Sequence, residues 1–382
     1  MANGSLDGVV VADFSRVLAG PYATMLLADL GATVVKVERP GTGDDTRAWG
    51  PPFAESGQST YFESVNRNKL SIALDLGDQS DQLIARRLAD TSDVVIENFA
   101  PGGLQRYGLD AVSVLQRNPR SVYCSITGFG SGKGAAMPGY DLLVQAMGGL
   151  MSITGQDSPT KAGVAVVDVL TGLHATVAIL AALRHRDITG EGQAMEVSLL
   201  SGLLSSMVNQ SGAYVGAGVV PGLLGNAHPS IAPYEVYQAR DLAMVLAVGN
   251  DGQFQALMEV LGDPDLAKDP RFASNTARVA HRELLKERLE LVLATRDAQD
   301  WQERLTRAGV PCGPINSIAD AFALAETLGL PAVVEVARDA GPTARQVANP
   351  VTMSATPATY RTAPSSLDAD RATVLALLDM ST

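Results

Sequence analysis

Residues 8–40 read GVVVADFSRVLAGPYATMLLADLGATVVKVERP and contain two β-branched runs on either side of a longer apolar segment. The first run, 8–14, ends at a polar cluster and predicts a buried strand. The apolar segment has Pro21 near its start and Gly31 just after its last turn, which is typical of a helix. Residues 33–40 predict a second strand. This order predicts a βαβ unit, whose two strands pair in parallel.

The alternation of strands and helices continues along the chain. Strands are predicted at 69–76, 93–99 and 121–127, with a helix at 79–92 and a short helix after Pro101. The pattern predicts an α/β fold with a large, open, Rossmann-like sheet that carries helices on its faces. Ligands bind such sheets at the carboxyl ends of the strands. Those ends are expected near 15–20, 38–39, 98–99 and 127–130.

The second half of the chain is mainly helical at first. Helices are expected at 141–150, 169–185 and 198–216. A segment rich in Gly and Pro, 215–233, predicts a linker. Short strands and amphipathic helices follow it and predict a second, smaller α/β domain. These elements are strands at 235–239 and 243–248 and helices at 251–262, 281–296 and 298–308; the C-terminal tail after them has a final helix near 368–380.

Composition narrows the range of functions. The net charge of −12 repels nucleic-acid phosphates and anionic lipids, so neither nucleic acid nor a membrane is expected as a partner. Cys124 and Cys312 are the two cysteines and lack metal-ligand spacing. Few cysteines, and no basic region before the first apolar run, predict a cytoplasmic protein.

Residues 162–183 are long and apolar enough to span a bilayer, but they contain Asp168 and His174. An ionised Asp near the bilayer centre costs a few kcal/mol. We therefore expect a helix buried in a soluble core, with His174 as a hydrogen-bonded core residue.

Glycine-rich nucleotide motifs are not matched. The first βα turn holds one glycine, Gly20, whereas a dinucleotide fingerprint needs three. The segment GFGSGKG, 128–134, lacks the P-loop spacing and the hydroxyl residue after Lys133. It is either a flexible loop or a mobile cover of the active site. The four histidines show no metal or triad spacing, so no permanently bound cofactor and no metal are expected.

Asp168 is the only formal charge between Lys161 and Arg184. One interpretation is an N-cap for a helix that begins at 169. Another is a nucleophilic carboxylate whose developing charge is stabilised by the amides of a helix start. The two roles are compatible. A free Asp has a pKa of about 3.9, so we expect Asp168 to be ionised at neutral pH.

Basic residues gather near the expected strand ends. Each one alone is more often a surface charge than a ligand contact. Together they form a candidate site for a phosphorylated nucleotide tail such as that of coenzyme A. They are Arg16, Lys36, Arg39, Arg47 and Arg106.

Several blocks of this sequence resemble the class III CoA-transferases of the CaiB/BaiF type, which include carnitine and bile-acid CoA-transferases. These enzymes move CoA from an acyl-CoA donor to a free carboxylic acid. The resemblance implies a homodimer of two chains that interlock like ring links, and a CoA thioester as substrate. It also implies a large CoA-binding domain 1–214 completed by 335–382, a linker 215–233 and a small domain 234–334. The matching blocks include residues 6–53, 66–76, 93–110, 139–155, 166–175, 225–237 and 248–254.

The resemblance also implies site residues and a mechanism. Asp168, in VVDVLTGLH, matches the catalytic aspartate, which passes through an aspartyl anhydride and an aspartyl-CoA thioester. Formyl-CoA:oxalate enzymes have Gln at Leu18 and Lys at Pro138, so neither oxalate nor formate is expected as substrate. The blocks GNAHP and GNDGQF resemble branches that act on succinyl-CoA or other dicarboxylic acyl groups. CoA contacts match Val17, Ala19, Arg39, Leu74, Asn98 and Arg106, and the acyl site matches Tyr140 and Asp141.

The alternative within this fold is a 2-methylacyl-CoA racemase. Such an enzyme moves an α proton between two bases, and the family racemases have His where this chain has Tyr140. Tyrosine, with a pKa of about 10, is a poor base at neutral pH, which favours transfer. An acyl-CoA-binding protein without activity is disfavoured by Asp168. A dehydrogenase is disfavoured by the missing glycine fingerprint.

Overall fold

The computed structural model describes residues 4–338 and 342–380, and the chain divides into two compact units. The chain enters the second unit briefly at Met151–Lys161 and enters it again after Val220, within the predicted linker. It returns after Leu328 rather than after residue 334, because β10 pairs with β11 inside the first unit. The first unit consists of Met1–Leu150, Ala162–Val220 and Gly329–Thr382, and the second of Met151–Lys161 and Pro221–Leu328.

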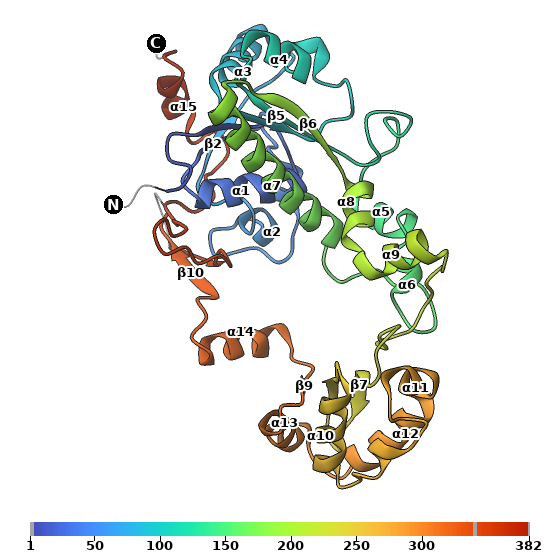
Figure 1. Cartoon of the computed structure of the whole chain (residues 1–382). Coiled ribbons are helices and arrows are strands. Elements are labelled where there is room, and N and C mark those ends of the chain that lie inside the picture. Colours follow the sequence, from blue (N-terminus) through green and yellow to red (C-terminus); the bar gives the residue numbers. More distant parts are fainter. Residues whose placement is uncertain (1–3, 339–341, 381–382) are drawn as a thin grey trace. The chain divides into compact units, whose positions relative to one another are not determined.

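Six parallel strands form the sheet of the first unit, in the order β3-β2-β1-β4-β5-β6 (Figure 1). Val11 of β1 pairs with Val34 of β2 and with Val94 of β4. The predicted open α/β sheet is therefore confirmed, and the strand order reverses between β1 and β4, where such sheets bind ligands. The strands are β1 (Val10–Asp13), β2 (Thr33–Glu38), β3 (Lys69–Ala73), β4 (Val94–Glu97), β5 (Val122–Thr127) and β6 (Gln193–Ser198).

Helices cover both faces of this sheet (Figure 1). Val11 and Val122 face α1 and α7, whereas the neighbouring residues Ala12 and Tyr123 face α3, α4 and α15. Because strand side chains alternate in direction, each buried β-branched run supplies two cores at once. The helices are α1 (Ala19–Asp29) and α7 (Val166–Thr189) on one face, and α3 (Gln79–Thr91), α4 (Ala111–Arg117) and α15 (Arg371–Leu377) on the other.

Helix α7 corrects two expectations. By length and composition it would cross a membrane, and 44% of its most apolar window is buried inside the molecule. It begins at Val166 rather than at 169, so Asp168 lies in its first turn and is not the N-cap. His174 is exposed rather than in the core, because it lies on the face turned away from α1 and the sheet. Its Nδ1 lies 2.8 Å from the Leu170 carbonyl.

The prediction of one helix at 198–216 is also wrong in part. An edge strand, β6, ends at Ser198, whose side chain accepts a hydrogen bond from the Ser201 N–H. Met207 separates two helices, and Val208, the first residue of the second helix, has a φ of 38°. The edge strand shows little hydrophobic alternation because several of its residues are exposed. The two helices are α8 (Leu199–Ser206) and α9 (Val208–Ala217).

The remaining elements of the first unit are short. A hairpin of β10 and β11 was not predicted, and a 3₁₀ turn follows β2. The short helix expected after Pro101 is a 3₁₀ turn, followed by α4. These elements are α2 (Thr60–Glu63), α5 (Asp141–Met147), β10 (Val333–Val336), β11 (Ala344–Val347) and the 3₁₀ turns Asp45–Ala48 and Gln105–Tyr107; α6 (Leu150–Ile153) lies where the chain first reaches the second unit's residues.

The second unit has an antiparallel sheet, β7-β8-β9, with its own apolar core. The predicted strands 235–239 and 243–248 and the helix 251–262 are confirmed to within one residue. Residues 151–161 join this unit, where the Gly225 N–H donates to the Gly155 carbonyl at 3.0 Å. Its elements are β7 (Tyr234–Gln238), β8 (Ala243–Ala247), β9 (Cys312–Pro314), α10 (Asp251–Leu261), α11 (Asn275–Ala280), α12 (Arg282–Leu293), α13 (Ala298–Arg307), α14 (Ile318–Thr327) and a 3₁₀ turn, Leu266–Lys268.

Candidate active site

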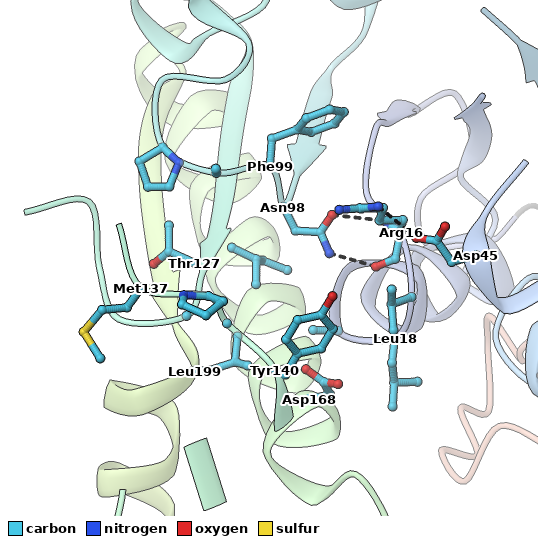
Figure 2. A pocket seen from close by; sticks show the side chains of 18 of the residues that line it. Arg16, Leu18, Asp45, Asn98, Phe99, Thr127, Met137, Tyr140, Asp168 and Leu199 are labelled. Atoms are coloured by element: carbon cyan, nitrogen blue, oxygen red, sulfur yellow. Dashed lines mark hydrogen bonds and ion pairs between the residues drawn. The ribbon is translucent and has the colours of Figure 1, made fainter. Parts of the chain in front are cut away.

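A cavity of about 780 Å³ lies at the carboxyl ends of β1 and β4, within the first unit (Figure 2). This is the position at which an open α/β sheet is expected to bind its ligand. Figure 2 shows the Asp168 carboxylate, the Tyr140 ring and the Leu18 side chain around the same space. The walls comprise residues 16–19, 98–101, 126–128 and 135–140, together with Arg39, Asp45, Trp49, Asp168 and Leu199.

The turn after β1 forms one wall in a strained conformation. Val17 has a φ of 71°, which is uncommon for a β-branched residue. Its N–H donates to both carboxylate oxygens of Asp44, at 3.2 and 3.3 Å. Lys36 Nζ donates to Asp44 at 2.8 Å and to the Ser15 carbonyl at 3.0 Å. This buried ion pair holds the turn so that Val17 and Leu18 line the cavity.

Asn98 ties that turn to the end of β4. Its Oδ1 accepts a hydrogen bond from the Arg16 N–H at 3.0 Å, and its Nδ2 donates to the Arg16 carbonyl at 2.7 Å. Both polar groups of the amide are thus used on the backbone. Asn98 therefore forms part of the cavity wall.

A second cavity of about 470 Å³ adjoins the first. Arg16, Arg39, Phe99 and Ala100 line both cavities. The residues that the resemblance assigns to CoA therefore divide between two adjacent spaces. Val17, Ala19 and Asn98 line the first, Leu74 and Arg106 line the second, and Arg39 lines both.

Two of the five basic residues are not available to a ligand. Lys36 is buried against Asp44, and Arg47 donates to both oxygens of Glu38 at 2.7 Å. The prediction that these two side chains would bind a phosphate is wrong. Carboxylates from β2 and the turn after it neutralise them, and sequence spacing does not reveal that pairing.

The other basic residues remain at the surface. Arg16 and Arg39 share one carboxylate, Asp45, at 2.8 and 3.1 Å. Their side chains are 52% and 59% exposed, which leaves N–H groups of both guanidiniums accessible. Arg106 lies over the Tyr107 ring, 4.6 Å from its centroid. These three arginines therefore provide the accessible positive charge of the two cavities.

Asp168 reaches the first cavity because α7 packs tightly on α1. A side chain at Gly172, one turn after Asp168, would meet the Ala19 carbonyl oxygen at 2.7 Å from its Cβ. The small residue therefore permits the close approach of the two helices. Asp168 is half-buried at the start of α7 and lines the cavity opposite the turn that carries Leu18.

The surroundings of Asp168 change its titration. Burial, followed by the negative charge of Asp141, raises the pKa of Asp168 from 3.8 to about 7. Among the described residues, its carboxylate accepts no hydrogen bond and pairs with no cation. The expectation of a fully ionised Asp168 at neutral pH is therefore wrong, because an apolar wall and a like charge both oppose ionisation.

Tyr61 lies near Asp168 without lining the cavity, and the sequence did not indicate it. It belongs to an apolar cluster that contains Leu18, Met25 and Val65. Burial, and then the charges of Asp168 and Asp141, raise the pKa of Tyr61 to about 12. Its phenol therefore keeps its proton at neutral pH. Because α2 is a single turn with no amphipathic period, the sequence carries no signal for it.

The loop 128–139 forms the wall that carries Tyr140. Its ends meet, because a Cβ at Gly128 would lie 2.4 Å from the Cα of Gly139. Glu196 of β6 accepts hydrogen bonds from the Ser131 N–H at 2.8 Å and from Thr127 Oγ1 at 2.9 Å. The glycine-rich segment is thus anchored at its base and on one side.

Asp141 does not line the cavity, although the resemblance places it at the acyl site. Its Oδ1 accepts hydrogen bonds from the Val167 N–H at 2.8 Å and the Asp168 N–H at 3.3 Å. Tyr140, the preceding residue, is 63% exposed and does line the cavity.

A second general base is not evident beside Asp168. No histidine is among the described residues that line either cavity. Over residues 4–338 and 342–380, no three His, Cys, Asp or Glu side chains are grouped to hold a metal ion. The cavity wall holds two carboxylates, Asp45, which pairs with Arg16 and Arg39, and Asp168, which pairs with no described cation.

The comparison with known families identifies the family of this chain. The sequence model of CoA-transferase family III matches residues 6–371. The chain belongs to CoA-transferase family III. As a family III CoA-transferase it is an enzyme, and its substrates are CoA thioesters.

Relatives of this family III CoA-transferase cover nearly its whole length. Succinate–glutarate CoA-transferase of Agrobacterium fabrum is 44% identical, over 98% of this chain and 96% of its own. Acetyl-CoA:oxalate CoA-transferase of Acetobacter aceti is 41% identical, over 85% and 84%. The crystal structure of a CaiB/BaiF family protein from Brucella suis has a TM-score of 0.87 and 41% identity, covering 99% and 100%.

Proposed function

We propose that this CoA-transferase uses Asp168 as a covalent nucleophile and exchanges CoA between short dicarboxylic acids. One observation carries the first part. Asp168 is the half-buried carboxylate of a cavity wall, and no described cation neutralises it. A carboxylate with a raised pKa is more basic and more nucleophilic than a free one.

The reaction then proceeds through two kinds of covalent adduct on Asp168, a mixed anhydride and a CoA thioester. An Asp168 oxygen attacks the thioester carbonyl of the donor, the C–S bond breaks, and CoA leaves as the thiolate. The thiolate attacks the Asp168 carbonyl carbon of the resulting anhydride and expels the donor acid. The acceptor carboxylate attacks the Asp168 carbonyl carbon of the aspartyl-CoA thioester and expels the CoA thiolate, which leaves a second anhydride. The thiolate attacks the acceptor acyl carbonyl of this anhydride and releases the Asp168 carboxylate. The net reaction exchanges one thioester for another and one free carboxylate for another, so no external energy source is needed.

The two adjoining cavities support a path for coenzyme A. Arg16, Arg39 and Arg106 offer accessible guanidinium groups for its phosphates at the second cavity. Arg16 and Arg39 line both spaces, so a pantetheine arm held there enters the first cavity and presents its thioester to Asp168. Coenzyme A is a substrate in this scheme and not a resident cofactor.

The acid pair is proposed from motifs and relatives. The blocks GNAHP and GNDGQF favour dicarboxylic acyl groups, and a relative at 44% identity is named for succinate and glutarate. Another relative is named for acetyl-CoA and oxalate, so oxalate belongs in the test panel despite Leu18 and Pro138. We expect succinyl-CoA as donor and a dicarboxylate of four or five carbons as acceptor.

Transfer is favoured over racemisation by the groups beside Asp168. A racemase needs a second base, and Tyr61 has a pKa of about 12. Tyr140 also lines the cavity and is exposed there. The phenol of Tyr61 keeps its proton at neutral pH and therefore cannot accept another.

A homodimer in the cytoplasm completes the proposal. Helices α5, α7, α8 and α9 carry exposed apolar side chains, a common feature of subunit interfaces. Leu142, Val177 and Val208 are 54%, 67% and 73% exposed. Two free thiols, Cys124 and Cys312, suit a reducing compartment. Sedimentation of the purified protein tests the dimer.

The decisive test combines a substrate panel with adduct trapping. The enzyme is incubated with succinyl-CoA, glutaryl-CoA or acetyl-CoA and with each free acid, including oxalate, and new thioesters are followed by mass spectrometry. A donor without an acceptor should give an adduct on the Asp168 peptide that hydroxylamine removes. Turnover without any such adduct would refute the covalent route. Exchange of the α proton in deuterated water would favour the racemase.

A further inference from the structure

Helix α7 begins without a side-chain cap from its own sequence. Ala165 occupies the N-cap position and contributes no side-chain hydrogen bond. The first amides of a helix have no partner within the helix and need one from elsewhere. Asp141, the first residue of α5, supplies it by accepting from the Val167 and Asp168 N–H groups.

Gln145 extends this support one turn along α5. Its Nε2 donates to the second oxygen of Asp141 at 2.6 Å, and its Oε1 accepts from the Ala162 N–H at 2.8 Å. Gln145 is 1% exposed, so these bonds form inside the molecule. Asp141 and Gln145 together hold the segment that leads from 162 into the first turn of α7.

Asp141 therefore has two relations to Asp168. It accepts a hydrogen bond from the amide of Asp168, which fixes that backbone position. Its negative charge also acts on the Asp168 carboxylate without a hydrogen bond between the two carboxylates. The first relation orients the nucleophile, and the second changes the energy of its ionised form.

We propose that Asp141 is a positioning residue for the transfer reaction, which holds Asp168 by its amide and places a second negative charge beside its carboxylate. This inference rests on the proposed role of Asp168 as nucleophile. It replaces the acyl-site role that the resemblance assigns to Asp141.

Charge repulsion of this kind favours the covalent adducts. Asp168 carries a charge as a free carboxylate and none as an anhydride or thioester. Attack on the thioester therefore relieves the repulsion with Asp141, whereas the reverse step restores it. An interaction that is unfavourable in the ground state and relieved on reaction speeds the chemical step.

The other groups that face Asp168 do not supply this effect. Tyr61 of α2 stays protonated, and Tyr22 of α1 belongs to the same apolar cluster. Tyr140 lines the cavity from the residue before α5. Arg16 and Arg39 line the cavity too, but both pair with Asp45. Asp141 is the one charge that acts on the Asp168 pKa among the described residues, burial being the larger cause.

The test compares Asp141→Asn with wild type by pH. The asparagine keeps an oxygen that accepts the helix amides but carries no charge. Enzyme is mixed with succinyl-CoA alone, quenched, and the fraction carrying CoA is measured by intact-protein mass spectrometry. We expect loading about tenfold slower at high pH. We also expect a shift in the pH dependence of the loading rate: the midpoint of its fall on the acidic side should move from about pH 7 toward pH 3.8.

Two further variants separate charge from folding. Asp141→Ser keeps a capping hydroxyl without the charge and should show the same shift of this pH midpoint, even if the asparagine variant folds poorly. Asp7→Asn removes an exposed charge outside the cavities and should load like wild type.

The outcomes distinguish this inference from the proposed function. A wild-type enzyme that never carries CoA on Asp168 overturns both. The inference alone is overturned if the wild type forms the adduct normally and the Asp141 variants keep both the loading rate and the pH midpoint of its acidic fall. If loading is slower but the pH midpoint of its acidic fall is unchanged, Asp141 only caps the start of α7, and the charge effect is refuted.

Discussion

Asp13 and Asp168 both belong to the first unit, yet burial affects them in opposite ways. Asp13, at the end of β1, is fully buried and pairs with Lys69, and Ser15 and Thr24 donate to it. Burial would raise its pKa, but the two nearby lysines, Lys69 and Lys36, and these hydroxyls bring the pKa below 3.8.

Asp168 has no such partners among the described residues, and its pKa rises to about 7. The difference indicates which carboxylate has a structural role and which is available for chemistry. A paired buried charge stabilises the surrounding turns, whereas an unpaired one is costly and is retained where it reacts. The same Asp→Asn change at both positions tests this contrast.

The largest expected effect is on turnover at Asp168. Replacing it with Ala removes the nucleophile, and we expect CoA transfer to fall by at least about a thousandfold. Binding of CoA should persist, because the arginines of the second cavity are untouched. A coupled thioester assay and equilibrium dialysis with CoA measure the two properties. Turnover retained in pure Asp168→Ala protein would contradict the assignment.

Next in size is the loss of stability on replacing Asp13. Asp13→Asn leaves Lys69 and Lys36 buried with one counter-charge fewer, which should cost about 3–5 kcal/mol. Burial already lowers the pKa of Lys69 to about 7, and losing Asp13 removes a charge that opposes this. Urea unfolding of the variant and wild type measures the difference. Asp7→Asn, at an exposed position, serves as the control and should change stability little.

The pH dependence of transfer should follow Asp168 alone. Because its pKa is about 7, the rate should fall about tenfold for each pH unit below that value. Asp13 has a lowered pKa, so its contribution to stability is lost only below the ordinary carboxyl range. The enzyme should thus lose activity reversibly between pH 7 and 5 while its circular dichroism is unchanged. If the protein unfolds between pH 7 and 5, the loss of activity cannot be assigned to the protonation of Asp168.

The smallest effect expected is a gain in stability from Asp168→Asn at pH 8. Asp168 has a higher pKa in the folded protein than in the unfolded chain, so the folded protein keeps this proton at pH values at which the unfolded chain has lost it. The free energy of unfolding therefore falls as pH rises toward 7. Removing the charge should then stabilise the protein by about 1 kcal/mol, since solvent screens a half-buried group. Thermal unfolding at pH 8 and pH 4 checks the sign, and at pH 4 the gain should largely vanish.

Much of the first unit follows from residues 8–40 and their repetition. Buried β-branched runs and apolar helices set the strand–helix order, and parallel pairing places the strand ends at one edge. The edge strand β6 was not predicted, because its exposed residues show little alternation of apolar and polar side chains. The break at Met207 was missed because a single left-handed residue, Val208, leaves no periodic signal.

The sequence by itself determined the α/β order, the position of the ligand site and the isolation of Asp168 within an apolar run, because periodicity and local composition are properties of neighbours along the chain. Only the tertiary structure decided which charges are neutralised. Lys36 and Arg47 pair with carboxylates of the β2 turn, whereas Asp168 meets Asp141, which lies 27 residues before it. Electrostatic energy depends on distance and burial in space, and sequence spacing fixes neither.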